Sequence, residues 1–130
     1  MSAESNKKMM LDAYEAFGKG DAKPVIDALA DTFTWRVPGH AATSGVYRTK
    51  QEVAEYLEKV GTLSGGTFQM EINDLLASDE HVVALVFMTG HARGKSLQMG
   101  GTHVWRLQNG KIVDVLALGD DEDVMDDFWS

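Results

Sequence analysis

Histidine is the residue type with the clearest chemical potential in this sequence of 130 residues, which contains four histidines and no cysteine. His103 lies in an alternating stretch whose other odd positions are Leu97, Met99, Gly101, Trp105 and Leu107. In a strand these side chains share one face, so the sequence predicts that His103 points into an apolar interior. Burial disfavours the charged imidazolium and lowers the histidine pKa, which leaves a neutral general acid or base. The alternative is a core histidine whose ring is hydrogen-bonded to the backbone or to a tyrosine hydroxyl.

Two further side chains are candidates to act with His103. Tyr14 lies on the inner stripe of a predicted helix, from which its hydroxyl can donate a hydrogen bond, and His91 lies near the end of another predicted strand. Counting along the hairpin places His103 opposite Leu85 or Val86, roughly 16 to 20 Å from His91, so a direct pair requires a bulge or sharp curvature. The residues expected to line a substrate pocket are Phe17, Phe33, Trp35, Val37, Tyr47, Met99, Trp105 and Val115.

Several other kinds of site are not expected. The absence of cysteine excludes disulfides and thiolate ligands, and no two histidines have the spacing of a zinc motif. The sequence also lacks a glycine-rich phosphate loop and a G-x-S-x-G nucleophile motif. We therefore expect neither a metal nor a cofactor.

The charge and hydropathy of the chain limit its partners. The formal net charge of −8, from 12 Lys and Arg against 20 Asp and Glu, repels phosphate backbones and argues against nucleic-acid binding. No stretch approaches the ~20 apolar residues that span a bilayer, and the N-terminus lacks the apolar core of a secretory signal. The sequence therefore predicts a soluble cytoplasmic protein with no membrane contact. The acidic residues after position 119 are expected to form a solvated tail helix.

Three helices are predicted in the first half of the chain. Met9, Ala13 and Phe17 form one apolar stripe, which ends at the glycines 18 and 20. A second helix is expected after Asp21, with Val25, Ile26, Leu29 and Ala30 on its buried face. A short strand over 33–37 and a loop over 39–48 follow. The third helix begins at a capping box of Thr49 and Glu52 and is expected to end at Gly61.

The second half of the chain has the period of two that is typical of strands. Four strands are predicted, over 67–77, 81–92, 97–108 and 111–118, and their short connections make an antiparallel meander. This order of helices followed by strands predicts one α+β domain over 1–130, with helices packed on a curved antiparallel sheet. For the last hairpin we expect a three-residue loop, which places Trp105 opposite Val113 and puts Ile112, Leu116 and Leu118 on the outer face.

The strand over 81–92 is apolar on both faces, so the sheet needs two covers. The helices supply one cover. A second copy of the chain is the expected second cover, through the outer sheet face, because large apolar patches usually mark interfaces.

Several segments together resemble the SnoaL-like group of the NTF2-like superfamily, over nearly the whole chain. They are Tyr14–Asp21, Leu29–Asp31 leading into Trp35–Gly39, Ser44–Tyr47, and His103–Leu107 with Asn109–Ile112. That superfamily includes ketosteroid isomerase, polyketide cyclases and limonene epoxide hydrolase. The resemblance implies a cone-shaped α+β fold, with three N-terminal helices packed on a strongly curved antiparallel sheet. It is specific for the fold and weak for activity, since this fold hosts both enzymes and binding modules.

The resemblance also implies roles for individual residues. His103 stands where ketosteroid isomerase has its protonated oxyanion-hole aspartate and where the cyclases have a catalytic aspartate, and His91 is similar to a second polar pocket residue of the cyclases. Other positions depart from the family's catalytic residues. Val37 stands where ketosteroid isomerase has its proton-abstracting aspartate, and the oxyanion tyrosine of that enzyme matches Ala13 and not Tyr14. Ala117 stands at the position of the second aspartate of the epoxide hydrolase.

The resemblance and the residues together leave two hypotheses open. The first is cofactor-free acid/base catalysis of the isomerase, cyclase or lyase type, on a small apolar carbonyl or enolisable substrate, with His103 as acid, base or oxyanion donor. The second is a non-catalytic ligand-binding or dimerisation module. The missing carboxylate base favours the second hypothesis, so the sequence does not decide whether the protein is an enzyme.

Overall fold

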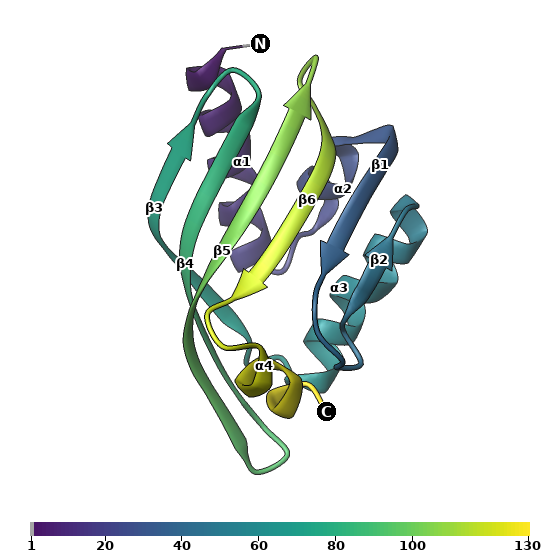
Figure 1. The fold of residues 1–130 in the computed structure, drawn as a ribbon, viewed down its shortest axis with the longest axis vertical. Coiled ribbons are helices and arrows are strands. Elements are labelled where there is room, and N and C mark those ends of the chain that lie inside the picture. Colours follow the sequence, from purple (N-terminus) through teal and green to yellow (C-terminus); the bar gives the residue numbers. More distant parts are fainter. Residues whose placement is uncertain (1) are drawn as a thin grey trace.

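The computed structural model describes residues 2–130 and contains four helices and six strands. The helices are α1 (Ala3–Gly18), α2 (Lys23–Asp27), α3 (Lys50–Leu63) and α4 (Glu122–Phe128). The strands are β1 (Leu29–Val37), β2 (Gly45–Tyr47), β3 (Gln69–Ala77), β4 (His81–Ala92), β5 (Lys95–Gln108) and β6 (Lys111–Gly119). They form one sheet in the order β2-β1-β6-β5-β4-β3, with α1 and α2 on one face (Figure 1). The predicted α+β class is thus confirmed.

The strands β3 to β6 form the predicted antiparallel meander. Both long hairpins turn through two residues with positive φ, Arg93-Gly94 (53° and 74°) and Asn109-Gly110 (54° and 75°). Positive φ at both central positions is the signature of a type I′ turn, whose twist matches that of the flanking strands. The first turn pairs Ala92 with Lys95, so β5 begins two residues earlier than predicted.

The register of the last hairpin differs from the prediction. The loop has two residues, Gln108 pairs with Lys111, and a bulge at Val113 places Trp105 opposite Val115. The expected three-residue loop with Trp105 opposite Val113 was wrong. Because the bulge adds one residue to β6, Ile112 falls on the inner face and is fully buried, whereas it was predicted to lie outside.

The first half of the chain differs from the prediction in three places. The helix α2 ends at Asp27, and Leu29 already belongs to β1, where it pairs with Ile112 of β6. Sheet pairing therefore overrides the helical spacing of this segment. The loop predicted over 39–48 contains β2, which pairs with β1, and α3 continues past Gly61 to Leu63.

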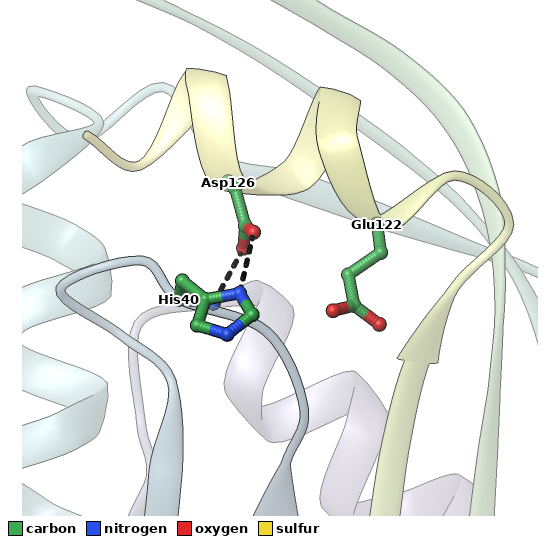
Figure 2. A group of neighbouring side chains, drawn as sticks. All are labelled: His40, Glu122 and Asp126. Atoms are coloured by element: carbon green, nitrogen blue, oxygen red, sulfur yellow. Dashed lines mark hydrogen bonds and ion pairs between the residues drawn. The ribbon is translucent and has the colours of Figure 1, made fainter.

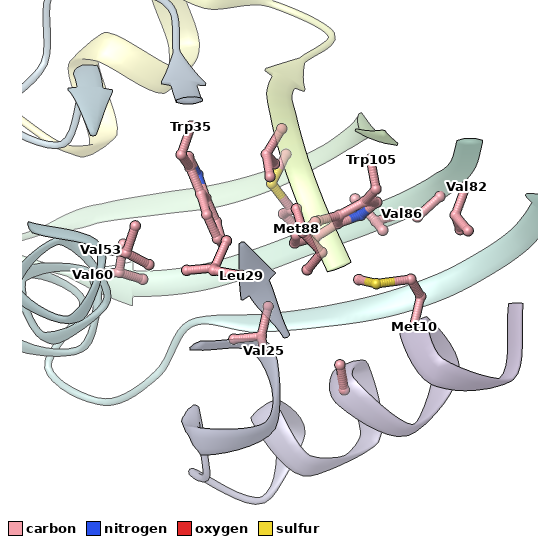
Figure 3. Packing of buried hydrophobic residues seen from close by; sticks show 14 of the residues in the cluster. Met10, Val25, Leu29, Trp35, Val53, Val60, Val82, Val86, Met88 and Trp105 are labelled. Atoms are coloured by element: carbon pink, nitrogen blue, oxygen red, sulfur yellow. The ribbon is translucent and has the colours of Figure 1, made fainter. Parts of the chain in front are cut away.

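The helical layer and the inner sheet face share one apolar core (Figure 3). Met10 of α1 and Val53 of α3 are fully buried against it, and the capping box of Thr49 and Glu52 starts α3 as predicted. The tail helix α4 is present, but it is not merely a solvated tail, because Phe128 and the following Trp129 are only 1% and 3% exposed. Within residues 2–130, no helix is long and apolar enough to cross a membrane.

Candidate functional site

A cavity of about 90 Å³ lies between the helices and the inner face of the sheet, and α4 contributes to its wall. Its lining is apolar and aromatic, and among residues 2–130 no Asp, Glu, Lys or Arg side chain contributes to it. The lining residues are Met10, Ala13, Tyr14, Phe17, Val25, Trp35, Val37, Thr43, Tyr56, Leu57, Val60, Phe68, Met70, Met88, His103, Trp105, Val115, Ala117, Leu118, Met125 and Trp129. Methionines from four different elements are included, and their flexible side chains can adapt to a ligand.

His103 faces this cavity from the middle of β5. Its neighbours across the sheet are Ala84 of β4 and Ala117 of β6, whose small side chains leave room beside the imidazole. Burial lowers the His103 pKa to about 4, so the ring is neutral at pH 7. Among residues 2–130, its Nε2 has no hydrogen-bond partner and is not one of the occluded polar atoms, so this atom is open to the cavity.

The other ring nitrogen of His103 contacts the first helix. The Tyr14 hydroxyl lies 2.6 Å from His103 Nδ1, and Trp105 Nε1 donates to the same hydroxyl at 2.8 Å. Desolvation raises the Tyr14 pKa, an effect that the hydrogen bond from Trp105 partly opposes. The tyrosine is therefore a neutral hydroxyl that bridges Trp105 and His103.

Aromatic rings continue from Trp105 to the far side of the cavity. The ring centroids of Trp105 and Trp35 are 5.3 Å apart, and those of Trp35 and Tyr56 are 6.0 Å apart. Burial raises the Tyr56 pKa, so its hydroxyl also stays neutral. Trp35 Nε1 is buried with no partner in residues 2–130. The cavity thus has a hydroxyl from α3 and an imidazole from β5, separated by two indole rings.

The loop over 38–44 and α4 meet beside the cavity. The backbone N–H of His40 donates to Asp126 Oδ1 at 3.0 Å, and His40 Nδ1 lies 3.6 Å from Asp126 Oδ2 (Figure 2). Together with Glu122, these residues offer three metal-type ligand atoms within 4.8 Å of one another, a grouping that the sequence did not suggest. Since the His40 side chain is 91% exposed and Asp126 already binds the loop, we interpret the contact as a tie between loop and helix.

The structure brings most of the predicted site residues together. His103, Tyr14, Phe17, Trp35, Val37, Trp105 and Val115 all line the cavity. Their roles in binding or catalysis remain predictions.

The structure places four predicted residues elsewhere. His91 is exposed on the β4–β5 hairpin, where its Nδ1 lies 3.0 Å from Ser96 Oγ. It is seven positions along β4 from Ala84, the partner of His103, which corresponds to roughly 23 Å. Phe33 is buried in the core, the Tyr47 ring packs on Tyr56, and the sulfur of Met99 accepts a hydrogen bond from the Asp121 N–H.

Several lining residues were not predicted from the sequence. Tyr56 and Val60 belong to the apolar stripe of α3, so the sequence predicts that they point inward. Their contact with the cavity depends on how α3 packs against the sheet. Thr43, Met125 and Trp129 come from a loop and from the tail helix. No local pattern marks these three residues as lining a cavity.

Comparison with known proteins agrees with this architecture. Solved NTF2-like structures share the fold, including an NTF2-like protein of unknown function from Burkholderia pseudomallei, which is 26% identical with a TM-score of 0.84 and covers 100% of this chain and 99% of its own. Bal32a, from a soil-derived mobile gene cassette, is 27% identical with a TM-score of 0.91 and covers 98% of each chain. The class of fold is therefore NTF2-like.

The sequence comparison is more specific. The family model described as a SnoaL-like domain matches residues 11–115, and the chain belongs to this family. An uncharacterized protein of Mycobacterium tuberculosis (strain H37Rv) is 23% identical over 131 residues and covers 100% of both chains.

Proposed function

We propose that this chain is a small-molecule binding protein whose cavity holds a compact, largely apolar ligand by one polar contact at His103. The observation that carries the proposal is a neutral imidazole with one free nitrogen in a cavity that no charged side chain lines within residues 2–130. An apolar cavity with a few convergent polar groups is the usual form of a ligand site.

We further propose that any catalysis here is cofactor-free and works through stabilisation of charge on the ligand oxygen. When a carbonyl compound loses its α-proton, the electron pair of the C–H bond moves onto the oxygen, where a buried donor stabilises it. With a pKa of about 4, His103 is a weak base. The proton would therefore have to pass to a more basic group carried by the substrate itself. The same contact between His103 and the ligand oxygen would serve an isomerase, cyclase or lyase and a non-catalytic binding module alike.

A binding experiment tests the proposal. Titration of the protein with 1-indanone, followed by tryptophan fluorescence and by NMR chemical shifts, should give saturable binding, because Trp35, Trp105 and Trp129 line the cavity. Ala117→Leu fills the space opposite His103 and should weaken binding at least tenfold. The matched control is Ala54→Leu, on an exposed position of α3, which should bind like the wild type. Absence of saturable binding, or equal binding by both variants, would contradict the proposal.

We also propose that a second copy of the chain covers the outer sheet face. Two cross-strand rows lie on this face. One row contains Asp74, Leu85, Thr102 and Leu118, the last of which also reaches the cavity wall, and the other contains Leu76, Val83, Val104 and Leu116. Leu85 and Leu118 are 40% and 38% exposed. Adjacent rows of this composition form the kind of patch that usually marks an interface.

A further inference from the structure

The direction of the hydrogen bonds around Tyr14 is fixed by its neighbour Trp105. An indole N–H is a donor and has no acceptor atom, so the 2.8 Å contact must run from Trp105 Nε1 to the Tyr14 oxygen. The remaining question is where the Tyr14 hydroxyl proton points. Among residues 2–130, the only acceptor bonded to this hydroxyl is His103 Nδ1, at 2.6 Å.

The opposite arrangement is costly. If His103 carried its proton on Nδ1 and donated it to Tyr14, the tyrosine hydroxyl would receive two donors, and its own proton would have no acceptor among residues 2–130. An unsatisfied buried donor costs roughly 1–3 kcal/mol. This cost favours a hydrogen-bond chain that runs from Trp105 through Tyr14 to His103 Nδ1, with the imidazole proton on Nε2.

The position of Nε2 gives this tautomer a consequence for the ligand. Nε2 is open to the cavity and has no protein partner within residues 2–130, and no charged side chain in that range lines the space before it. We infer that Trp105 and Tyr14 are positioning residues that hold His103 as the Nε2–H tautomer, so that the cavity selects ligands presenting an acceptor oxygen, such as a ketone, enolate or phenolate. This inference rests on the proposed function.

Nitrogen-15 NMR of the full chain tests the tautomer directly. Long-range proton–nitrogen correlation at pH 7 should show one protonated nitrogen, Nε2, and one unprotonated nitrogen, Nδ1, for His103. A protonated Nδ1, or rapid exchange between the two tautomers, overturns the inference whether or not any ligand binds.

The variant Tyr14→Phe tests the role of the hydroxyl. Donation from Tyr14 stabilises the neutral ring, so its loss should raise the His103 pKa above the wild-type value, while burial, which the phenylalanine preserves, still keeps it below the usual value of ~6.5. The matched control is Tyr56→Phe, which also removes a hydroxyl from the cavity lining but has no hydrogen bond to His103. An equal pKa shift in both variants, or none in Tyr14→Phe, contradicts the positioning role.

Ligand preference tests the class of ligand. 1-Indanone and indane have nearly the same shape, but only the ketone has an acceptor oxygen. Wild-type protein should bind 1-indanone about fivefold more tightly, the typical effect of one net hydrogen bond, and His103→Leu should lose this preference. Saturable binding of both compounds with equal affinity overturns the inference and leaves the pocket intact. Failure of both to bind overturns the proposed function, while the tautomer measurement still decides the inference.

Discussion

The properties of His103 depend on small neighbours and on a distant helix. Ala84 and Ala117 leave space beside the ring, and Tyr14, which is 89 positions away in the chain, bonds its Nδ1. The alternation of residues along β5 was enough to predict an inward-facing histidine, and the apolar stripe was enough to predict an inward-facing Tyr14. The contact between them was not predictable, because it depends on how α1 packs on the sheet.

The buried histidine should make stability depend on pH. Its pKa is about 4 in the folded state and ~6.5 when unfolded, so between these values the unfolded chain binds the extra proton and acid destabilises the fold. From pH 7 to pH 5, His103 should cost the wild type about 2 kcal/mol of unfolding free energy. Urea denaturation at both pH values should show that His103→Gln, which keeps an acceptor for Tyr14 and does not titrate, loses correspondingly less.

The control for this experiment is His91→Gln, since His91 is exposed on the hairpin. It should follow the wild type at both pH values. If His103→Gln and the wild type lose the same stability between pH 7 and pH 5, the folded protein does not hold His103 in its neutral form.

At the scale of elements, the sequence was informative where one signal acts alone. The capping box at Thr49 located the start of α3, and the period of two located β4 with the same bounds as observed. Prediction from the sequence failed where a local pattern competes with strand pairing in the folded sheet. Leu29 fits a helical spacing but pairs with Ile112, and the bulge at Val113 has no mark in the sequence, although it decides which side chains of β6 face inward.

The close packing of β5 against β6 should leave no room for a side chain at Gly101. A Cβ at Gly101 would lie 2.7 Å from the backbone oxygen of Leu118 and 2.7 Å from Met88 Cε. Because the backbone oxygen cannot move without breaking strand pairing, Gly101→Ala should lower the unfolding free energy by about 1–3 kcal/mol. Chemical denaturation measures this change.

The matched control is Gly61→Ala, in the last turns of α3, where an added Cβ meets nothing within 4 Å. Alanine has the higher helix propensity, so this variant should gain about 0.5–1 kcal/mol. Equal effects of the two substitutions would show that the approach of β5 to β6 is looser than described.

The whole molecule has an apolar cavity on one side of its sheet and an apolar surface on the other. The sequence predicted that both faces of the sheet are apolar, because the strand over 81–92 has apolar side chains on both of its faces. The helices and α4 enclose the inner side. The outer side, with Leu76 50% exposed and Phe87 38% exposed, is not covered by any other part of residues 2–130.

The proposed dimer should dissociate when a charge is placed on the outer sheet face. Leu85 lies in a cross-strand row on the outer face and does not line the cavity. Sedimentation velocity at micromolar concentration should therefore show a dimer for the wild type and a monomer for Leu85→Lys, which places a charge in the proposed interface. The control, Leu11→Lys, alters an exposed leucine of α1 and should remain dimeric. A monomeric wild type would contradict the proposal.

The role of His103 in ligand binding can be tested by a crystal structure of the protein with 1-indanone bound. We expect the ketone oxygen within about 2.7–3.2 Å of His103 Nε2, with the rings of the ligand against Trp35 and Trp105. A ligand bound elsewhere, or one in the cavity with its oxygen directed away from His103, would contradict the proposal that this histidine is the polar contact of the site.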